Sequence, residues 1–365
     1  MVWALLLVAC NSNNKVAEER MSSIDSTQQS KVADILAERL EDFCAKSGQV
    51  IVMDVQTGEI LAMVGEAASQ ELGLVRTASL LAALETGRVK MSDSVDVGDG
   101  VYAVGDANLY DHNWRRGGYG KMTVSQGFQV SSNIANYKVM KRAFDEEQAF
   151  FDMLEKMSYG QPAEMAGIDS LKAAHLFTPQ DSGWSEKSLA WFCIGYNQHI
   201  APIQMLTFYN AIANGGKMVR PSLYKGDAEV INPQIASEAG IDSMRMALRK
   251  YITDGLGRRA ESELVDVAGT SGTIPVSTEE DNTEGKQNTD FHIEFCGYFP
   301  ADAPRYSVIV SMNKMGLPAS GGAMAGSVFK EIAECIMSGK KNDSLSATCY
   351  AVVWLEPQRI YLTIY

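Results

Sequence analysis

The 365-residue chain lacks the residue clusters that mark metal-binding and nucleic-acid-binding proteins. Its six cysteines include no CxxC pair and its four histidines are scattered, so no group has the spacing of a zinc site. We therefore expect no metal and no other cofactor. Basic residues form no stripe, and 32 Lys and Arg against 45 Asp and Glu give a net charge of −13. Such an acidic chain is poorly suited to gripping phosphate backbones, which excludes direct nucleic-acid binding.

Internal repeats and strong compositional bias are also missing from the sequence. Hydrophobic residues make up 46% of the chain and charged residues 21%, close to the average for globular proteins. The length fits one large domain or two of about 100–200 residues each. The chain can therefore bury a substantial core, and neither a fibrous nor a fully disordered protein is indicated.

The apolar run at residues 1–9 is too short to cross a bilayer about 30 Å thick. Leu7-Val8-Ala9-Cys10 fits a bacterial lipobox, although the usual basic residue before the apolar run is missing. A buried N-terminal strand with an incidental cysteine is the alternative. We interpret residues 1–10 as a lipoprotein-type signal and residues 11–30 as a tether. Lipidated Cys10 would then hold the chain at the outer face of a bacterial membrane or in the periplasm.

The hydrophobic pattern predicts strands near both ends of the chain and helices between them. The expected strands are residues 49–55, 59–64, 264–268, 292–299 and 306–312. The expected helices are residues 31–45, 74–84, 124–144, 205–214 and 322–337. The polar segment at residues 279–289 is expected to be an exposed loop.

This order predicts an α+β fold. We expect one five-stranded antiparallel sheet with strands from both ends of the domain, helices on both faces, and a mostly helical subdomain near residues 120–260. The domain is assigned to residues 31–337. Residues 338–365 form a tail of uncertain origin, because its β-branched and aromatic end fits either an extra pair of strands or the product of a frameshift.

Four stretches occur in an informative order and spacing. They are Val52–Met63, Val124–Asn133, Ile194–Gly216 and Cys296–Met312. Together they resemble the transpeptidase domain of class B penicillin-binding proteins, which share a fold with serine β-lactamases. The resemblance implies a peptidoglycan D,D-transpeptidase of cell-wall synthesis, whose Ser-x-x-Lys serine attacks a D-Ala carbonyl of a stem peptide.

The residues expected for that attack are replaced. Alignment without gaps on the end of the central helix puts Gly73 at the serine position and Arg76 at the lysine position. Glycine has no nucleophile, and arginine stays protonated, so it cannot act as the base. A shift of one residue puts Leu74 and Thr77 there instead, which again gives no nucleophile at the serine position.

The other two motifs of the family are partly kept. Ser131 and Asn133 match its Ser-x-Asn motif, in which the hydroxyl relays a proton and the amide orients substrate. The Lys-Thr/Ser-Gly motif corresponds to Thr270-Ser271-Gly272, so Thr270 stands in place of the lysine. The backbone amides of Gly73 and Thr273 correspond to the oxyanion donors, and since neither residue is proline we expect both donors to survive. Ser338 and Lys341 also match Ser-x-x-Lys, but such short patterns often arise by chance.

These replacements predict a catalytically inactive homologue. Its expected ligands are a peptidoglycan stem peptide or a β-lactam, bound weakly and without acylation, and its expected partners are wall-synthesis proteins. Two alternatives stay open. One is an active transpeptidase or carboxypeptidase with an unrecognised nucleophile such as Ser131, and the other is a decaying gene copy without function.

Overall fold

The computed structural model describes residues 21–65, 70–168, 170–276 and 289–339, together with the backbone of two short strands near the C-terminus. The predicted lipid-attachment residue Cys10 and the first half of the predicted tether lie outside these residues. So does almost all of the loop expected at residues 279–289.

Five antiparallel strands form the central sheet, in the order β11-β12-β13-β1-β2. Strand β1 pairs with β13 from the far end of the domain, so that Ile51 lies opposite Ile309. The inner strands are buried along most of their length, as their apolar sequences require. The predicted five-stranded sheet is therefore confirmed. The strands are β1 (Ala45–Asp54), β2 (Ile60–Val64), β11 (Ala268–Val276), β12 (Asp290–Phe299) and β13 (Tyr306–Met315).

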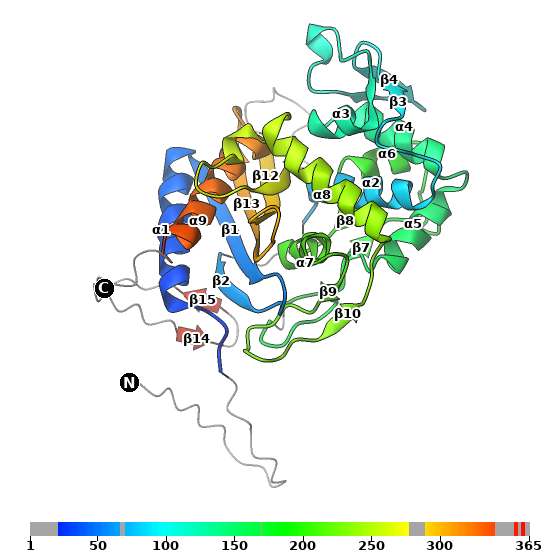
Figure 1. The fold of residues 1–365 in the computed structure, drawn as a ribbon. Coiled ribbons are helices and arrows are strands. Elements are labelled where there is room, and N and C mark those ends of the chain that lie inside the picture. The colour runs from blue at the N-terminus through cyan, green and yellow to red at the C-terminus, as the bar shows by residue number, and fades with distance from the viewer. Residues whose placement is uncertain are drawn as a thin grey trace.

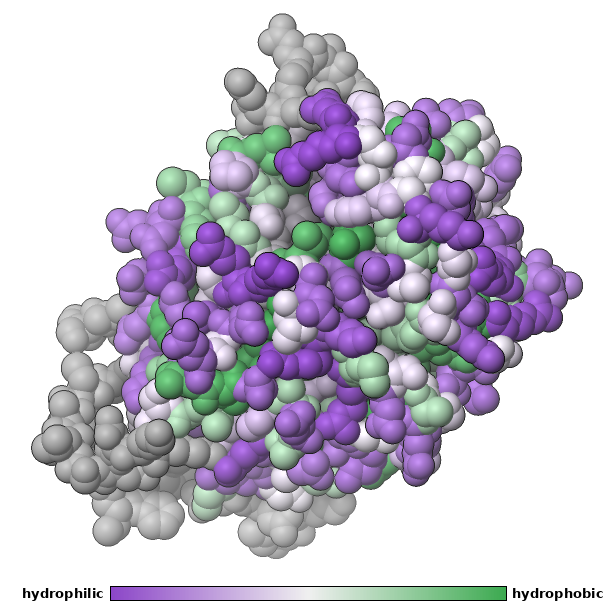
Figure 2. Space-filling model, turned by 45° about the horizontal axis from the view of Figure 1, so that its top comes forward, coloured by the Kyte–Doolittle hydropathy of each residue, from purple (hydrophilic) through white to green (hydrophobic). Residues whose placement is uncertain are grey.

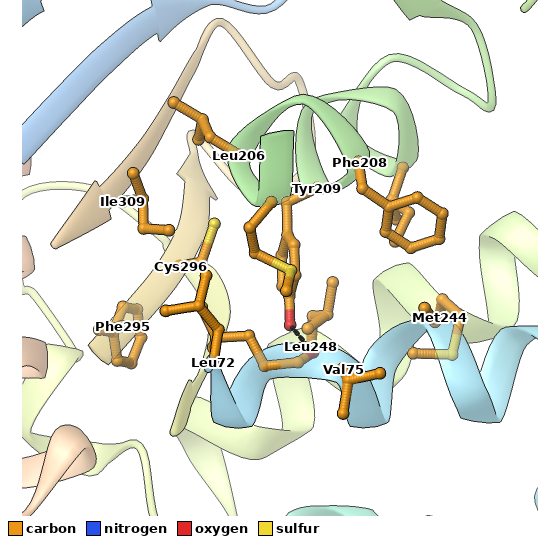
Figure 3. Close-up of a cluster of buried hydrophobic side chains, with 14 of the residues drawn as sticks. Leu72, Val75, Leu206, Phe208, Tyr209, Met244, Leu248, Phe295, Cys296 and Ile309 are labelled. Carbon is orange, nitrogen blue, oxygen red and sulfur yellow. Dashed lines mark hydrogen bonds between the residues drawn. The ribbon is translucent and has the colours of Figure 1, made fainter. Parts of the chain in front are cut away.

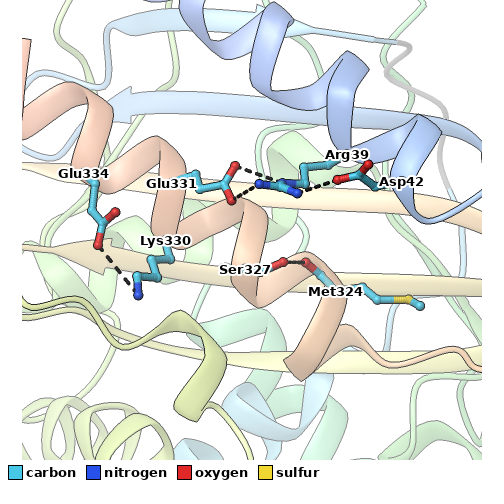
Figure 4. Close-up of polar contacts among 7 residues, drawn as sticks. All are labelled: Arg39, Asp42, Met324, Ser327, Lys330, Glu331 and Glu334. Carbon is cyan, nitrogen blue, oxygen red and sulfur yellow. Dashed lines mark hydrogen bonds and ion pairs between the residues drawn. The ribbon is translucent and has the colours of Figure 1, made fainter.

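Two helices, α1 (Ser26–Asp42) and α9 (Gly326–Gly339), cover one face of the sheet (Figure 1). They bury an apolar stripe that includes Val32 and Leu36 on α1 and Ile332 on α9. At their outer edge the Arg39 guanidinium donates to both carboxylate oxygens of Glu331, at 2.6 and 3.0 Å (Figure 4). These contacts join the beginning of the domain to its end.

The opposite face packs on α7 (Pro202–Ala213), whose twelve residues are all buried. Helices α2 (Arg76–Glu85) and α8 (Glu238–Thr253) surround it (Figure 1). Tyr209 of α7 points between them, and its hydroxyl donates to the Leu74 carbonyl at 2.9 Å (Figure 3). The central helix α2 is thus enclosed on nearly every side, as the apolar residues on nearly every face of residues 74–84 predict.

A mostly helical part lies beyond α2, as expected (Figure 1). Its helices are α3 (Val124–Gln129), α4 (Asn133–Ala143), α5 (Glu147–Lys156) and α6 (Ser188–Cys193). Short two-stranded sheets lie in this helical part and next to it. They are β3 (Ser94–Asp96) with β6 (Lys121–Thr123), β4 (Val101–Val104) with β5 (Ala107–Tyr110), β7 (His175–Leu176) with β8 (Gln198–His199), and β9 (Met218–Val219) with β10 (Val230–Asn232). Single helical turns are η1 (Gly73–Val75), η2 (Trp114–Arg116), η3 (Arg258–Ala260) and the π-helical turn η4 (Gly321–Ala325).

Two helix predictions were wrong in their bounds. The helix expected over residues 124–144 is broken, because Ser131 has a φ of +52° and Ser132 caps a new helix by accepting from the Ala135 amide. The first helix starts at Ser26 rather than residue 31, because Asp25 caps it through the Gln28 amide at 2.9 Å. The packed part of the chain therefore includes residues that were assigned to the tether.

The strand expected at residues 264–268 was also misplaced. Leu264 is 63% exposed and lies before the strand, which begins at Ala268 and continues to Val276. Leu264, Val265 and Val267 resemble the start of a strand, but they lie in the irregular segment that leads into β11.

Near the C-terminus, β14 (Trp354–Glu356) pairs with β15 (Arg359–Tyr361), in the tail where an extra pair of strands was one of two interpretations. In the part of the chain that the structure describes, no helix is both long and apolar enough to span a membrane. On the face shown in Figure 2, hydrophilic side chains predominate and apolar ones gather only in small patches.

Candidate active site

Gly73 begins the helical turn η1 that leads into α2, and it is buried against β11. A Cβ atom on Gly73 would lie 2.9 Å from Gly272 Cα and 3.2 Å from the Thr273 amide nitrogen. The structure thus brings together three of the residues singled out in the sequence. It also leaves no room for a side chain at Gly73 unless the backbone of β11 shifts.

Two further glycines close the same region. Gly195, with a φ of +112°, approaches so closely that a Cβ atom there would lie 2.8 Å from Gly73 Cα. Gly321, in η4, faces Gly272 from the other side, and a Cβ atom there would overlap the Gly272 carbonyl oxygen. Backbones of four separate segments therefore meet at Gly73, Gly195, Gly272 and Gly321, which we call the glycine junction.

The Gly73 amide is already hydrogen-bonded. It donates to Glu294 Oε2 at 3.0 Å, and Glu294 is fully buried on β12 directly opposite Gly272. Burial raises the pKa of Glu294 to about 8, against the opposing effects of the Gly73 N–H and the Arg76 charge. Among the described residues, Glu294 Oε1 has no hydrogen-bond partner. The amide that was predicted to be an oxyanion donor is thus already hydrogen-bonded to an internal carboxyl group.

Arg76 lies in the first turn of α2 and is only 8% exposed. Burial lowers its pKa, while the nearby Tyr251, Tyr209, Asp111 and Glu294 favour the charged form. Its Nε finds no hydrogen-bond partner within the described part of the chain. Arg76 and Ser132 line a cavity of about 20 Å³ between α2, α3 and α4, roughly enough for one water molecule.

The Ser-x-Asn segment folds around a buried carboxylate. Ser132 Oγ donates to Asp111 Oδ2 at 2.8 Å, and the Ile134 amide donates to Asp111 Oδ1 at 3.1 Å. Asn133 Nδ2 donates to the Tyr110 carbonyl at 2.8 Å. Ser131 Oγ is buried and has no partner among the described residues.

The third motif lies on β11, beside η1. Thr270, at the position where the resemblance predicts a lysine, has a buried Oγ1 with no hydrogen-bond partner among the described residues. Ser271 Oγ lies 2.6 Å from the Tyr251 hydroxyl. Thr273 Oγ1 accepts from the Gly321 amide at 2.9 Å, which fixes β11 to η4. The chance match Ser338 is exposed at the end of α9, and Lys341 lies outside the described residues.

Sequence reasoning missed two buried acids of this site, Asp111 and Glu294. Asp111 stands in a polar turn-like stretch, so nothing in the sequence set it apart. Glu294 did carry a signal, because it is a charged residue between Ile293 and Phe295 in a strand that is otherwise buried. At the described residues, no group of His, Cys, Asp and Glu side chains is arranged to hold a metal ion.

A five-stranded antiparallel sheet with helices on both faces, and three motif segments that meet beside a buried central helix, define the fold of a penicillin-binding transpeptidase domain. The transpeptidase domain of Burkholderia pseudomallei penicillin-binding protein 3 has this fold, with a TM-score of 0.77 and 24% identity over 90% of this chain and 98% of that chain. A Burkholderia ambifaria structure described as a peptidoglycan glycosyltransferase gives a TM-score of 0.75 with 26% identity over 88% and 98% of the two chains.

The sequence places the chain within this class. The profile of the penicillin binding protein transpeptidase domain matches residues 48–334, and the chain belongs to that family. It is 25% identical to the probable peptidoglycan D,D-transpeptidase PenA of Neisseria flavescens, over 91% of this chain and 84% of that protein. It is also 26% identical to penicillin-binding protein PbpB of Mycolicibacterium smegmatis, over 80% of this chain. The chain spans only 50% of PbpB, so the activity of such a whole protein does not transfer with the domain.

Proposed function

We propose that this transpeptidase homologue takes part in peptidoglycan synthesis by binding rather than by acyl transfer. The observation that carries the proposal is the buried Gly73 at the start of the central helix, where a nucleophile would have to stand. Glycine offers no attacking oxygen, and a side chain at this position would require the backbone of β11 to shift. Backbone donors alone give only a small part of the rate of such enzymes.

Arg76 supports the same conclusion. A general base must be able to lose its proton near neutral pH, and a guanidinium does not do so in proteins even where burial lowers its pKa. With threonine at position 270, the second cation of the family's motifs is replaced as well. We therefore propose that the positions Gly73, Arg76 and Thr270 together account for the loss of chemistry.

Ser131 is a poor substitute nucleophile. Its hydroxyl has no hydrogen-bond partner among the described residues, so no base stands beside it. Lys138, on the following helix, donates to the Asp96 carbonyl at 2.7 Å and lies over the Tyr102 ring, 4.3 Å from its centroid. The lysine is thus engaged elsewhere, which counts against the alternative of an active enzyme.

Of the two kinds of ligand expected, partner proteins fit better than wall peptides. A stem peptide or a β-lactam would need the Gly73 amide, which Glu294 occupies, so weak non-covalent binding is the most that the site supports. We propose wall-synthesis proteins as the main partners. Lipidated Cys10 would hold the chain at the outer face of a bacterial membrane or in the periplasm. Incorporation of labelled palmitate that is lost in Cys10→Ala tests the anchor, and equal incorporation in both would contradict it.

Acylation is tested by incubating the full chain with a fluorescent penicillin and running a denaturing gel. The probable peptidoglycan D,D-transpeptidase PenA of Neisseria flavescens, run on the same gel, serves as the comparison that is expected to label. We expect no labelled band from this chain. A band that disappears in Ser131→Ala would instead establish an active enzyme with that nucleophile.

Partner binding is tested by pull-down of wall-synthesis proteins with the full chain and with a chain that lacks residues 31–337. Recovery of such proteins only with the full chain supports the proposal. Failure to recover any of them, together with no binding of a stem pentapeptide in calorimetry, would contradict it. A decaying gene copy is then the remaining interpretation, and a melting curve without a cooperative transition would favour it.

A further inference from the structure

We propose that Glu294 acts as an internal ligand of the Gly73 amide. By accepting this hydrogen bond, its carboxyl group prevents the amide from binding the carbonyl oxygen of a stem peptide or β-lactam. The inference rests on the proposed function and deepens it, because it names the residue that keeps the site closed. It also predicts that restoring the three motif residues is not enough to restore acylation.

The first support is the hydrogen bond itself. A backbone amide carries one proton, and the Gly73 proton points to Glu294 Oε2 at an N···O distance of 3.0 Å. Any incoming carbonyl oxygen must therefore displace the carboxyl group before it can use this donor. A donor that is already satisfied gives no net gain to a transition state, since one hydrogen bond replaces another.

The second support is the space that the carboxyl group fills. Glu294 lies opposite Gly272 in the β11–β12 pairing, and a Cβ atom on Gly272 would overlap Glu294 Oε2. The carboxyl group thus occupies the place that a side chain at residue 272 would take. Glu294 has no exposed surface, so it cannot leave this place by a simple rotation into solvent.

The third support is the charge nearby. Arg76 is buried, its Nε has no hydrogen-bond partner in the described part of the chain, and its positive charge attracts the Glu294 carboxyl group. The charge of Arg76 opposes the rise in the Glu294 pKa that burial causes, and so favours the ionised carboxylate. Because a carboxylate accepts a stronger hydrogen bond than a neutral acid, Arg76 strengthens the contact between Glu294 and the Gly73 amide.

The test compares two full-length variants in their rate of labelling by fluorescent penicillin. The triple variant is Gly73→Ser/Arg76→Lys/Thr270→Lys, and the quadruple variant adds Glu294→Ala. We expect the quadruple variant to label at least tenfold faster. Equal labelling of the two, including no labelling of either, would overturn the proposal.

A matched control distinguishes the hydrogen bond from a general loosening of the site. Glu71 lies two residues before Gly73 and accepts from the Asn197 amide at 3.3 Å, without contacting the Gly73 amide. Adding Glu71→Ala to the triple variant should leave labelling unchanged. If this control speeds labelling as much as Glu294→Ala does, the effect is not specific to Glu294 and the proposal fails.

A second measurement applies if the multiple variants do not fold. In the otherwise unchanged chain labelled with 15N-glycine, exchange of the Gly73 amide is followed by NMR for the wild type, Glu294→Ala and Glu294→Gln. We expect exchange to be at least tenfold faster in the alanine variant and close to wild type in the glutamine variant, which keeps an acceptor oxygen. Equal exchange in all three would contradict the internal ligand.

The outcomes separate this inference from the proposed function. Labelling of the wild-type chain would overturn the absence of a nucleophile, whatever Glu294 does. If the wild-type chain is not labelled and the triple and quadruple variants are labelled at the same rate, the proposed function stands and only the role of Glu294 is overturned.

Discussion

The molecule brings an arginine near a glutamate in two contrasting environments, one partly exposed and the other buried. At the outer edge, Arg39 meets Glu331 with two hydrogen bonds, in a region that water reaches. Inside the domain, Arg76 and Glu294 are both buried and attract each other, yet Arg76 Nε and Glu294 Oε1 find no hydrogen-bond partner among the described residues. The partly exposed Arg39–Glu331 ion pair has good geometry but contributes little to the free energy of unfolding. Arg76 and Glu294 are buried with hydrogen-bonding atoms left unpartnered, and their burial lowers the free energy of unfolding.

The comparison indicates that the inner groups are not there for stability. A buried charge without full hydrogen bonding lowers the free energy of unfolding, so its presence at a candidate active site points to a role in that site.

The largest effect concerns Glu294→Gln and its dependence on pH. Burial raises the Glu294 pKa from its ordinary value of 4.5 to about 8. Below pH 4.5 the carboxyl group is protonated in both the folded and the unfolded state, and the wild type bears no cost. As the pH rises towards 8, the unfolded state ionises first and the wild type loses stability, at about 1.4 kcal/mol per pKa unit.

The free energy of unfolding of Glu294→Gln should therefore exceed that of the wild type by about 3–5 kcal/mol more at pH 8.5 than at pH 4.5. Urea denaturation at the two pH values measures this difference. Other carboxyl groups titrate alike in both proteins and cancel. A difference that does not change with pH would show that Glu294 is not buried as described.

The next effect concerns Asp111→Ala, which removes a buried carboxylate that accepts from Ser132 Oγ and from the Ile134 amide. We expect a loss of about 3 kcal/mol, because two charge-assisted hydrogen bonds disappear and the start of α4 loses its support. The control is Asp145→Ala, whose carboxylate pairs with Arg88 and is 79% exposed, with an expected change below about 0.5 kcal/mol. Equal losses in the two variants would contradict the description of the site.

Gly73→Ala tests the glycine junction. Its added Cβ atom would lie 2.9 Å from Gly272 Cα, so β11 must shift, and overpacking of this kind costs about 1–3 kcal/mol. Thermal or urea unfolding measures the loss. The control is Gly339→Ala, because a Cβ atom there would meet no backbone atom and the free energy of unfolding should hardly change. Gly87→Ala would not serve, since the positive φ of Gly87, +69°, makes any substitution there strained.

The smallest effect is expected at the outer edge. Arg39→Ala removes the pair with Glu331 and the contact with Asp42, yet all three side chains are partly exposed. We expect a loss of about 0.2–1 kcal/mol, decreasing further at high salt. A loss as large as that for Asp111→Ala would reverse the contrast between the two environments.

Much of the fold followed from patterns that act locally. Apolar runs located the sheet and the enclosed helix α2, because burial on one or all faces leaves a direct mark on the sequence. The bounds of helices depended on single capping residues, Asp25 and Ser132, which look like any other polar residue in a loop. Ser131, with its positive φ, broke a helix that its neighbours' propensities predicted to continue.

The candidate site was predictable only where it coincides with a motif. Gly73, Arg76 and Thr270 stood out because the family's pattern sets an expectation for each position. Asp111 and Glu294 had no such expectation, and their importance comes from residues more than 20 positions away that they contact in the fold. Tertiary contacts of this kind leave no periodic signal in a sequence. The one local sign was the charge of Glu294 within an apolar strand, and it did not reveal the partner of that residue.

The glycine junction has a consequence for the order in which the protein is made. Gly73 is synthesised early, but Gly272 and Gly321, which complete its surroundings, emerge from the ribosome much later. Until then, the segment around Gly73 has no β11 or η4 to pack against, and the Gly73 amide has no Glu294 to bind. Such contacts between distant residues form slowly. The site is therefore among the last parts of the nascent chain to close, and a chain released before residue 321 would leave it open.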